Sequence, residues 1–423
     1  MPTKYVRSIS SGVKVGGVRG EEKLVSVHSQ WYDPSSVRQV YFDNNATTLV
    51  DPAVFEAMKP FFLEDYGNAS SIHALGQKAR AVVEDARAQV ADLIGAKTTE
   101  IVFTSGGTES DNTALRGVAM ALRSKGNHII TTRIEHSAIL HPCRQLEEEG
   151  FRVSFLRVDR KGLLSLDRLR EAIDEDTILI SVMHANNEIG VIEPLKEMAA
   201  MARERGVLLH TDAVQTVGKI PLDVADLGVD LLSLSAHKFH GPKGVGALYV
   251  RSDVAMLPLI HGGSHERSRR AGTLNVPGIV GLGKTCELAR ASLQDFGTRV
   301  RGLRDKLEKG IIEGIPDTVV NGSTQERVPH LTNISFRGIE GEALLIALDF
   351  QGVAVSTGSA CSSGTVEPSH VLMALGGDRG LHKSAIRLSL SRMNEDQDVD
   401  YVLGILPEVV RKMRQVTPTY RKG

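Results

Sequence analysis

Cysteine is scarce in this chain of 423 residues. Cys143, Cys286 and Cys361 are widely separated and form no CxxC pair. An odd number in this arrangement argues against a disulfide framework and against a structural zinc site. The cysteines instead favour a reducing compartment, so we expect a cytoplasmic protein in which a free thiol can persist.

Long hydrophobic runs and an excess of one charge are also missing. No window approaches eighteen uninterrupted apolar residues, so we expect no transmembrane helix, and the first residues lack the apolar core of a secretory signal. The formal net charge is -1. We therefore expect no nucleic-acid or membrane partner, and the expected partners are small molecules and other proteins.

The first 38 residues differ from the rest of the chain. Residues 1–20 contain four basic residues, several serines and no acidic residue. This composition weakly resembles an organellar transit peptide, so organellar import stays open. We interpret residues 1–38 as a flexible extension, with ordered sequence beginning near "VYFDNNATT".

Apolar runs of strand length then alternate with helical periods from "EIVFTSGG" to "DLLSLSAHK". This alternation predicts a mostly parallel sheet covered by helices over residues 39–289, with a clear amphipathic helix at 71–94. The order then becomes a long helix, a strand "HLTNISF", a helix "GEALLIALDF", a strand "GVAVS", and a final strand and helix. The sequence therefore predicts an α/β protein with a smaller α+β domain over residues 290–423.

Three polar segments follow strands of the predicted sheet. "TSGGTES" places Gly107 and Thr108 where a strand meets a helix N-terminus, which suits a phosphate. Asp212 and Lys238 each follow an apolar strand, where a carboxylate needs a cationic partner and a lysine can serve as a Schiff-base amine. Each segment alone could be structural. Together, in this order, they suggest pyridoxal phosphate.

Cys361 lies in "STGSACSSG", a stretch in which no residue is larger than threonine. Such a segment can bury very little, so packing gives no reason for a cysteine there. One interpretation is a mobile arm that carries a reactive thiol. The other is an inert cysteine in an ordinary flexible loop.

These segments belong to a larger set that resembles the signature segments of the cysteine desulfurases. The set runs through "YFDNNATT", "SGGTESDN", "EHSAIL", "ANNEIG", "TDAVQ", "SAHKFHGPKG", "AGTLNV", "GSACSSG" and "IRLSLSR". The form "SACSSGTVEPSHVLMA" looks more like the NifS-type member of the family. The resemblance implies the type I fold of pyridoxal-phosphate-dependent transferases, a homodimer, and conversion of L-cysteine to L-alanine. It also implies sulfur delivery to an acceptor such as an iron-sulfur scaffold protein, for nitrogenase or for general cluster assembly.

The resemblance implies a chemical role for five residues. Lys238 would form the Schiff base and shuttle the substrate Cα proton, and Asp212 would keep the pyridinium nitrogen protonated. Gln215 would contact the ring hydroxyl, while His136 would stack on the ring and assist proton transfers. The Cys361 thiolate would attack the substrate sulfur and carry it as a persulfide, and a positive group such as protonated His136, or the loop's own amides, should favour ionisation of the thiol.

The resemblance assigns the other matching residues to binding. Those that would hold the phosphate are Gly107, Thr108, Ser235, His237 and, from the second subunit, Thr273. Asn187 and Arg387 would bind the substrate carboxylate, which suits the planar charged fork of arginine, and Asn187 would also border the cofactor. The implied substrate is L-cysteine, and the implied cofactor is pyridoxal 5'-phosphate.

Other functions explain less of the sequence. "GIVGLGKT", residues 278–285, fits the nucleotide-binding pattern GxxxxGK(S/T), but mostly polar residues precede it where a buried strand is required. A selenocysteine lyase or an aminotransferase would use Lys238 and Asp212 but leave Cys361 little to do, and a non-catalytic sulfur carrier would use Cys361 alone. "HGGSHE" lacks zinc-ligand spacing, so we expect no intrinsic metal, although Cys361 could act as a transient iron-sulfur ligand.

Three positions depart from the family pattern. Ser264, Ser268 and Ala236 stand where glycine is frequent in the family. If the backbone needs a positive φ there, a side chain would strain the turn. The departures therefore concern local loop geometry and leave the predicted reaction unchanged.

Overall fold

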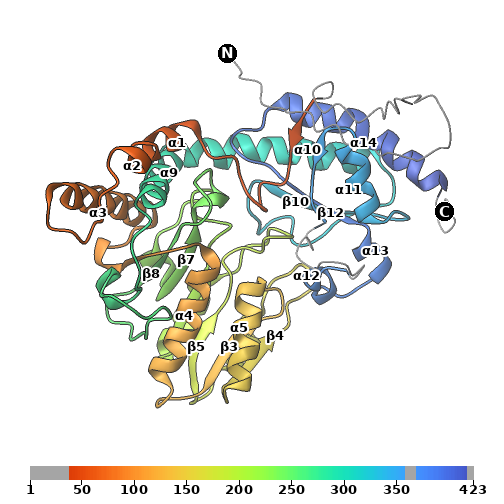
Figure 1. Cartoon of the computed structure of the whole chain (residues 1–423). Coiled ribbons are helices and arrows are strands. Elements are labelled where there is room, and N and C mark those ends of the chain that lie inside the picture. Colours follow the sequence, from red (N-terminus) through yellow and green to blue (C-terminus); the bar gives the residue numbers. More distant parts are fainter. Residues whose placement is uncertain (1–37, 358–367, 417–423) are drawn as a thin grey trace, which may run out of the picture.

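The computed structural model describes residues 38–357 and 368–416. The predictions for the N-terminal extension before residue 38 and for Cys361 lie outside these described residues. Within them, the chain forms a large central sheet covered by helices and a smaller sheet beside it (Figure 1). The predicted α/β class is confirmed.

The central sheet has seven strands and is mostly parallel. In spatial order they are β2 (Ile101–Thr104), β8 (Gly246–Val250), β7 (Leu231–Ser235), β6 (Leu208–Asp212), β5 (Thr177–Ser181), β3 (His128–Thr132) and β4 (Arg152–Leu156). Only β8 runs antiparallel to its neighbours among these pairs. The connection between β7 and β8 covers residues 236–245, which is too short for the crossover that a parallel pair needs.

Helices cover both faces of this sheet, so the residues of β2, β3, β5, β7 and β8 are buried on both sides. One core contains α4 (Gly107–Leu122) and α5 (Ser137–Glu148), and the other contains α3 (Ala74–Ile94), α7 (Leu195–Glu204) and α9 (Val276–Asp295). The predicted helix 71–94 is thus observed from Ala74, and Gly95 ends it in the left-handed conformation (φ 70°). The segment 278–285 lies inside α9 and so does not form a phosphate loop.

The smaller unit is built on an antiparallel sheet with strand order β12-β10-β9. Its elements are β9 (Thr318–Val320), β10 (Leu331–Phe336), β12 (Ala385–Ser389), α10 (Arg301–Gly314), α11 (Gly341–Asp349) and α14 (Asp396–Val416). A short pair, β1 (Val40–Tyr41) with β11 (Val353–Ala354), also packs into this core. Strand β1 therefore packs with the C-terminal unit, while Leu372 of α12 (His370–Ala374) packs with the large core. The division at residue 289 stays a prediction.

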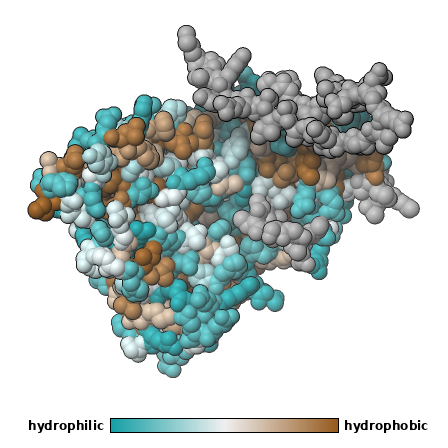
Figure 2. Space-filling model, viewed as in Figure 1, coloured by the Kyte–Doolittle hydropathy of each residue, from teal (hydrophilic) through white to brown (hydrophobic). Residues whose placement is uncertain are grey.

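The remaining elements are short connectors. They are α1 (Pro52–Met58), α2 (Pro60–Leu63), α6 (Leu166–Ala172), α8 (Val224–Leu227), α13 (Arg379–Lys383), η2 (Thr98–Glu100), η3 (Ala236–Lys238), η4 (Glu266–Ser268) and η5 (Phe296–Val300). Phe62 and Leu63 of α2 and Ile72 before α3 expose large apolar side chains, and apolar surface gathers over these helices (Figure 2). No helix in the described part of the chain combines the length and the apolar character needed to cross a membrane.

A buried ion pair holds the turn η4 against helix α3. Arg87 contacts Glu266 through Nη2–Oε1 at 2.7 Å and Nη1–Oε2 at 2.8 Å, and their side chains are 4% and 1% exposed. Glu266, Arg267 and Ser268 all have positive φ (46°, 54° and 64°), which costs free energy for residues with a Cβ. Of the three departures from the family pattern, only Ser268 is among the described residues with positive φ.

Replacing Glu266 with glutamine should destabilise the protein. It removes the buried carboxylate that pairs with Arg87 and leaves only the half-exposed Glu84 as a counter-ion, so we expect the free energy of unfolding to fall by about 3 kcal/mol. Glu84 offers a matched control because its half-exposed carboxylate also contacts Arg87, at 3.2 Å. Glu84→Gln should cost less than about 1 kcal/mol. Urea unfolding of both variants measures the difference, and equal losses would contradict the prediction.

Candidate active site

An open cavity of about 960 Å³ lies at the carboxyl ends of the parallel strands, where α/β sheets usually bind ligands. The predicted residues that line it are Gly107, Thr108, His136, Asn187, Asp212, Gln215, Ser235, His237, Lys238 and Arg387. Thr273 does not line this cavity and is exposed between η4 and α9, so its predicted role toward a second subunit stays a prediction. Cys361 lies outside the described residues.

Lys238 occupies the end of the turn η3, directly after the buried strand β7. Its Nζ donates to the backbone carbonyls of Asn45 at 2.6 Å and Ala46 at 2.9 Å. The segment that carries these carbonyls is tied to the same turn, because the amide and hydroxyl of Thr48 both donate to the His237 carbonyl. The amine is therefore held at the cavity wall by backbone groups.

Asp212 ends strand β6 and lies deep in the cavity wall. Its Oδ1 accepts the Val214 amide at 2.9 Å. Burial raises the pKa of Asp212, and His136, this hydrogen bond and Lys238 partly offset that rise. Burial and the charge of Asp212 raise the pKa of Asp111, a second carboxyl that also lines the cavity. A cationic group placed in the cavity would thus favour the ionised form of Asp212.

The N-terminus of helix α4 faces a second open cavity that adjoins the first. Both cavities share Ala46, Gly107, Thr108, Ser235 and His237. A Cβ at position 107 would approach Val214 Cγ2 to 2.7 Å, so any residue other than glycine would force Val214 to shift. Burial lowers the pKa of His237 to about 4, so this ring is an uncharged hydrogen-bonding group at neutral pH. A helix N-terminus with neutral donors around it suits a phosphate group.

His136 caps helix α5 at the cavity wall. Its Nδ1 accepts the Ala138 amide at 3.1 Å, and burial lowers the pKa of His136, an effect that the charge of Asp212 opposes and the charge of Lys238 reinforces. A neutral imidazole that accepts through Nδ1 carries its proton on Nε2. The lowered pKa of His136 does not favour a positive charge on this ring, and because Cys361 lies outside the described residues, the predicted help from His136 to the Cys361 thiolate stays a prediction.

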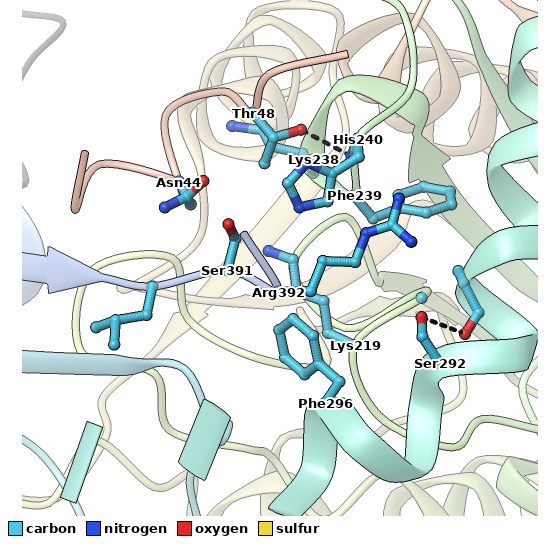
Figure 3. A pocket seen from close by; sticks show the side chains of 13 residues that line it. Asn44, Thr48, Lys219, Lys238, Phe239, His240, Ser292, Phe296, Ser391 and Arg392 are labelled. Atoms are coloured by element: carbon cyan, nitrogen blue, oxygen red, sulfur yellow. Dashed lines mark hydrogen bonds between the residues drawn. The ribbon is translucent and has the colours of Figure 1, made fainter. Parts of the chain in front are cut away.

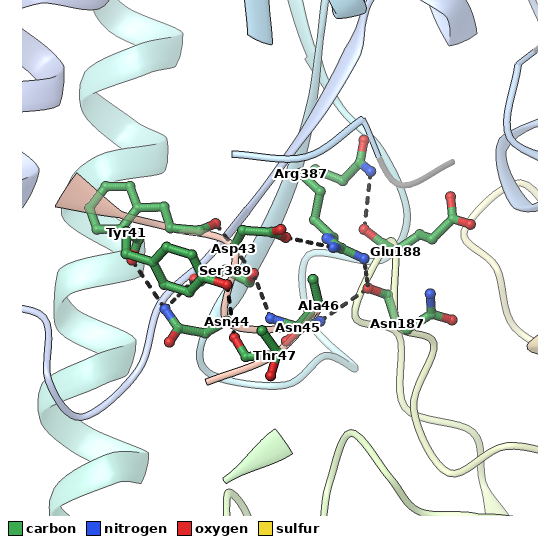
Figure 4. Close-up of polar contacts among 12 residues, drawn as sticks. Tyr41, Asp43, Asn44, Asn45, Ala46, Thr47, Asn187, Glu188, Arg387 and Ser389 are labelled. Atoms are coloured by element: carbon green, nitrogen blue, oxygen red, sulfur yellow. Dashed lines mark hydrogen bonds and ion pairs between the residues drawn. The ribbon is translucent and has the colours of Figure 1, made fainter. Parts of the chain in front are cut away.

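Arg387 extends from strand β12 of the smaller unit into the same cavity (Figure 4). One Nη donates to Asp43 Oδ1 at 2.7 Å and the other to the Asn187 carbonyl at 3.1 Å. Asn45 Nδ2 donates to the same carbonyl at 3.0 Å. The guanidinium is thus fixed in orientation, which suits a fork that binds a carboxylate.

The cavity fits pyridoxal phosphate in its donor set and its charges. Asp212 is a buried carboxylate that a cationic ring nitrogen would stabilise, and the α4 N-terminus is a phosphate cradle in which a Cβ at Gly107 would clash. Lys238 lies at the wall between them. The residues present therefore match a pyridine ring with a phosphate at one end and a reactive aldehyde.

Sequence reasoning missed several groups that shape this cavity. Asn45 and Ala46 act through their carbonyls, Asp43 orients Arg387, and Asp111 lies beside Asp212. The quoted segments "YFDNNATT" and "SGGTESDN" contained all four residues. Backbone carbonyls carry no signal of their residue type, however. No pattern in the sequence shows that Asp111 lies beside His210 and Asp212 of strand β6.

Known proteins share this fold and these segments. A model of the aminotransferase class-V family matches residues 40–402. Cysteine desulfurase IscS of Methanosarcina thermophila is 52% identical, over 90% of this chain and 94% of its own, and the IscS of Dictyoglomus turgidum is 51% identical, over 90% and 97%. A solved NifS-like protein is 42% identical, with a TM-score of 0.84 over 89% of this chain and 100% of its own. The chain therefore belongs to the aminotransferase class-V family and, within it, to the pyridoxal-phosphate-dependent cysteine desulfurases.

Proposed function

We propose that this protein converts L-cysteine to L-alanine and retains the sulfur as a persulfide on Cys361. The observation that carries the proposal is the meeting of Lys238, Asp212 and Arg387 in one cavity, although they come from different strands and from both units of the fold. Bound pyridoxal phosphate supplies an electron sink for the substrate Cα. The substrate carbon-sulfur bond breaks, its electron pair stays with carbon, and the sulfur joins the Cys361 sulfur.

The chain's own residues divide the work. Arg387 and Asn187 hold the substrate carboxylate, and Asp212 holds the ring nitrogen in its protonated form. Lys238 anchors the cofactor and moves the Cα proton, while His136 presents the proton on its Nε2 to the cavity. Atoms, protons and electrons balance overall, because the Cys361 thiol and L-cysteine give the Cys361 persulfide and L-alanine.

Both ends of the segment that contains Cys361 are attached beside the cavity. Ser356 pairs with Arg387 through two backbone hydrogen bonds, of 2.6 and 3.2 Å. At the other end, His370 Nε2 lies 2.9 Å from the carbonyl of Glu135, the neighbour of His136. Cys361 lies five positions after Ser356 in the chain, so the two Cα atoms can be at most about 18 Å apart. This supports a role for Cys361 at the site.

Incubation of the purified yellow protein with L-cysteine and a thiol reductant tests the function. We expect one alanine for each sulfide that the reductant releases. A protein that binds pyridoxal phosphate but forms no alanine from L-cysteine would overturn the proposal.

The proposal extends to partners and location. Exposed apolar side chains over α2 and the start of α3 support a homodimer, in which exposed Thr273 reaches the phosphate of the second subunit. The sulfur acceptor is an iron-sulfur scaffold protein, as the IscS names of the relatives suggest. Cys143 and Cys286 are free and buried, which supports a cytoplasmic location.

Replacing Arg387 with lysine should weaken substrate binding. Lysine offers a single point charge in place of the two-pronged guanidinium, so we expect KM for L-cysteine to rise on the order of tenfold to a hundredfold. Arg251→Lys is the matched control because Arg251 pairs with Asp230, away from the lining of this cavity. Steady-state kinetics with both variants measures the effect, and an unchanged KM in Arg387→Lys would refute the assignment.

A further inference from the structure

A second buried lysine lies behind Lys238. Lys219 follows strand β6 in the chain, is 3% exposed, and shares with Lys238 the lining of a narrow gap between the two units (Figure 3). Its Nζ donates to Gln215 Oε1 at 2.9 Å and lies 3.4 Å from His330 Nε2. None of the roles assigned above uses this amine.

Burying a lysine is costly, so its retention needs a reason. Burial lowers the pKa of Lys219 well below its usual value, and the charges of Lys238 and Arg387 lower it further. The titratable groups around it are His237, Lys238, His240, His330, Arg387 and Arg392. None of these is acidic, so no carboxylate among them compensates a charge on Lys219. An uncharged amine that donates a hydrogen bond is consistent with this environment.

Lys219 determines which way the Gln215 amide points. The amine donates to Oε1, so the Gln215 NH₂ group must face the other side, where it donates to the Asn45 carbonyl at 3.1 Å. Lys238 Nζ donates to that same carbonyl, so the Gln215 NH₂ lies at the wall of the active-site cavity.

His330 supports the same arrangement from the smaller unit. Its Nε2 lies 2.9 Å from Asn45 Oδ1, and Asn45 Nδ2 is already used to donate to the Asn187 carbonyl. Burial lowers the pKa of His330 well below its usual value, with the charge of Lys219 next in effect, so the ring is neutral and donates through Nε2. The two neighbours thus fix the donor directions around Asn45.

We propose that Lys219 is a positioning residue, which through its hydrogen bond to Gln215 keeps the Gln215 NH₂ directed at the ring oxygen of bound pyridoxal phosphate. The inference rests on the proposed function, because it uses the predicted contact between Gln215 and that oxygen. Without Lys219 the amide is free to turn over. Its carbonyl oxygen would then face the ring oxygen and repel the negative charge there.

The pH titration of the bound cofactor's absorption band tests this proposal without L-cysteine. A donor to the ring oxygen stabilises its negative charge, so loss of the donor should make the Schiff base hold its proton to a higher pH. We expect Lys219→Met to raise the titration midpoint by about 0.5 to 1 pH unit. Lys196→Met, which removes an exposed lysine paired with Asp226, should leave the midpoint unchanged.

A double-mutant cycle separates positioning from a direct effect of the lysine. If Lys219 acts through Gln215, Lys219→Met should cause no further shift in a Gln215→Ala background. Equal shifts in both backgrounds, or no shift in the native background, would overturn the proposal. A purely structural lysine would lower the melting temperature without moving the midpoint, which would also overturn it. Lys219→Leu repeats the cycle if the methionine variant does not fold.

The positioning role of Lys219 and the proposed function can be refuted separately. The titration needs only bound cofactor, whereas the function is judged by alanine release from L-cysteine. A shifted midpoint without alanine would refute the desulfurase activity and leave the positioning role intact. Alanine release by the native protein, together with an unmoved midpoint in Lys219→Met, would support the desulfurase activity and refute the positioning role.

Discussion

Replacing Lys238 with alanine is expected to abolish alanine release from L-cysteine, with a rate loss on the order of a thousandfold or more. The variant loses the amine that anchors the cofactor and the group that moves the Cα proton. Both losses arise at one atom, Nζ, which the Asn45 and Ala46 carbonyls hold at the cavity wall. No other described lysine lines this cavity, so we expect no substitute for it.

Steady-state alanine release in the presence of added pyridoxal phosphate measures this effect. Lys196→Ala is the matched control, since its side chain is exposed on α7. A steady rate in Lys238→Ala close to that of the native protein would refute the lysine assignment. The absorption spectrum gives a second check, because the variant cannot form the internal Schiff base and its bound cofactor should absorb like the free aldehyde.

Replacing Cys361 with alanine is expected to abolish the protein-bound persulfide and to reduce alanine formation by at least about a hundredfold. The other two thiols are poor substitutes. Burial raises the pKa of Cys143 to about 12, and burial also raises the pKa of Cys286 far above its usual value. Both side chains are fully buried, so neither presents a thiolate to substrate at neutral pH.

Mass spectrometry after a single turnover with L-cysteine tests the prediction. The native protein should carry one extra sulfur on the peptide that contains Cys361, and the variant should carry none. Cys143→Ala is the control and should retain both the persulfide and alanine release. Equal alanine formation by the native protein and Cys361→Ala would refute the proposed role of this cysteine.

Local patterns in the sequence predicted much of this architecture. Strand-length apolar runs separated by amphipathic helices mark a parallel sheet covered on both faces, and helix α3 was expected within three residues of its observed start. The strand β8 was not predicted, although "GALYV" is an apolar run. Its antiparallel direction follows from the short connection from β7. The periodicity of apolar residues carries no information on strand direction.

The candidate site also has features that the sequence predicted and features that it did not. Asp212 and Lys238 could be recognised because each polar residue follows an apolar strand, and the carboxyl ends of parallel strands meet at one edge of a sheet. Residue type and chain position are enough for that inference. The pKa of His136 could not be read in this way, since it depends on burial and on the charges of Asp212 and Lys238.

The order of residues in the chain thus specified the class of fold, the strand ends that carry the chemistry, and the family. Folding brought together what is distant in sequence: Asp43 with Arg387, β1 with β11, and Lys219 with His330. Hydrogen-bond direction and the pKa of a buried group depend on neighbours in space, and these three pairs join segments more than a hundred residues apart. The environment of Lys219, and the orientation of Gln215 that follows from it, therefore became visible only in the folded protein.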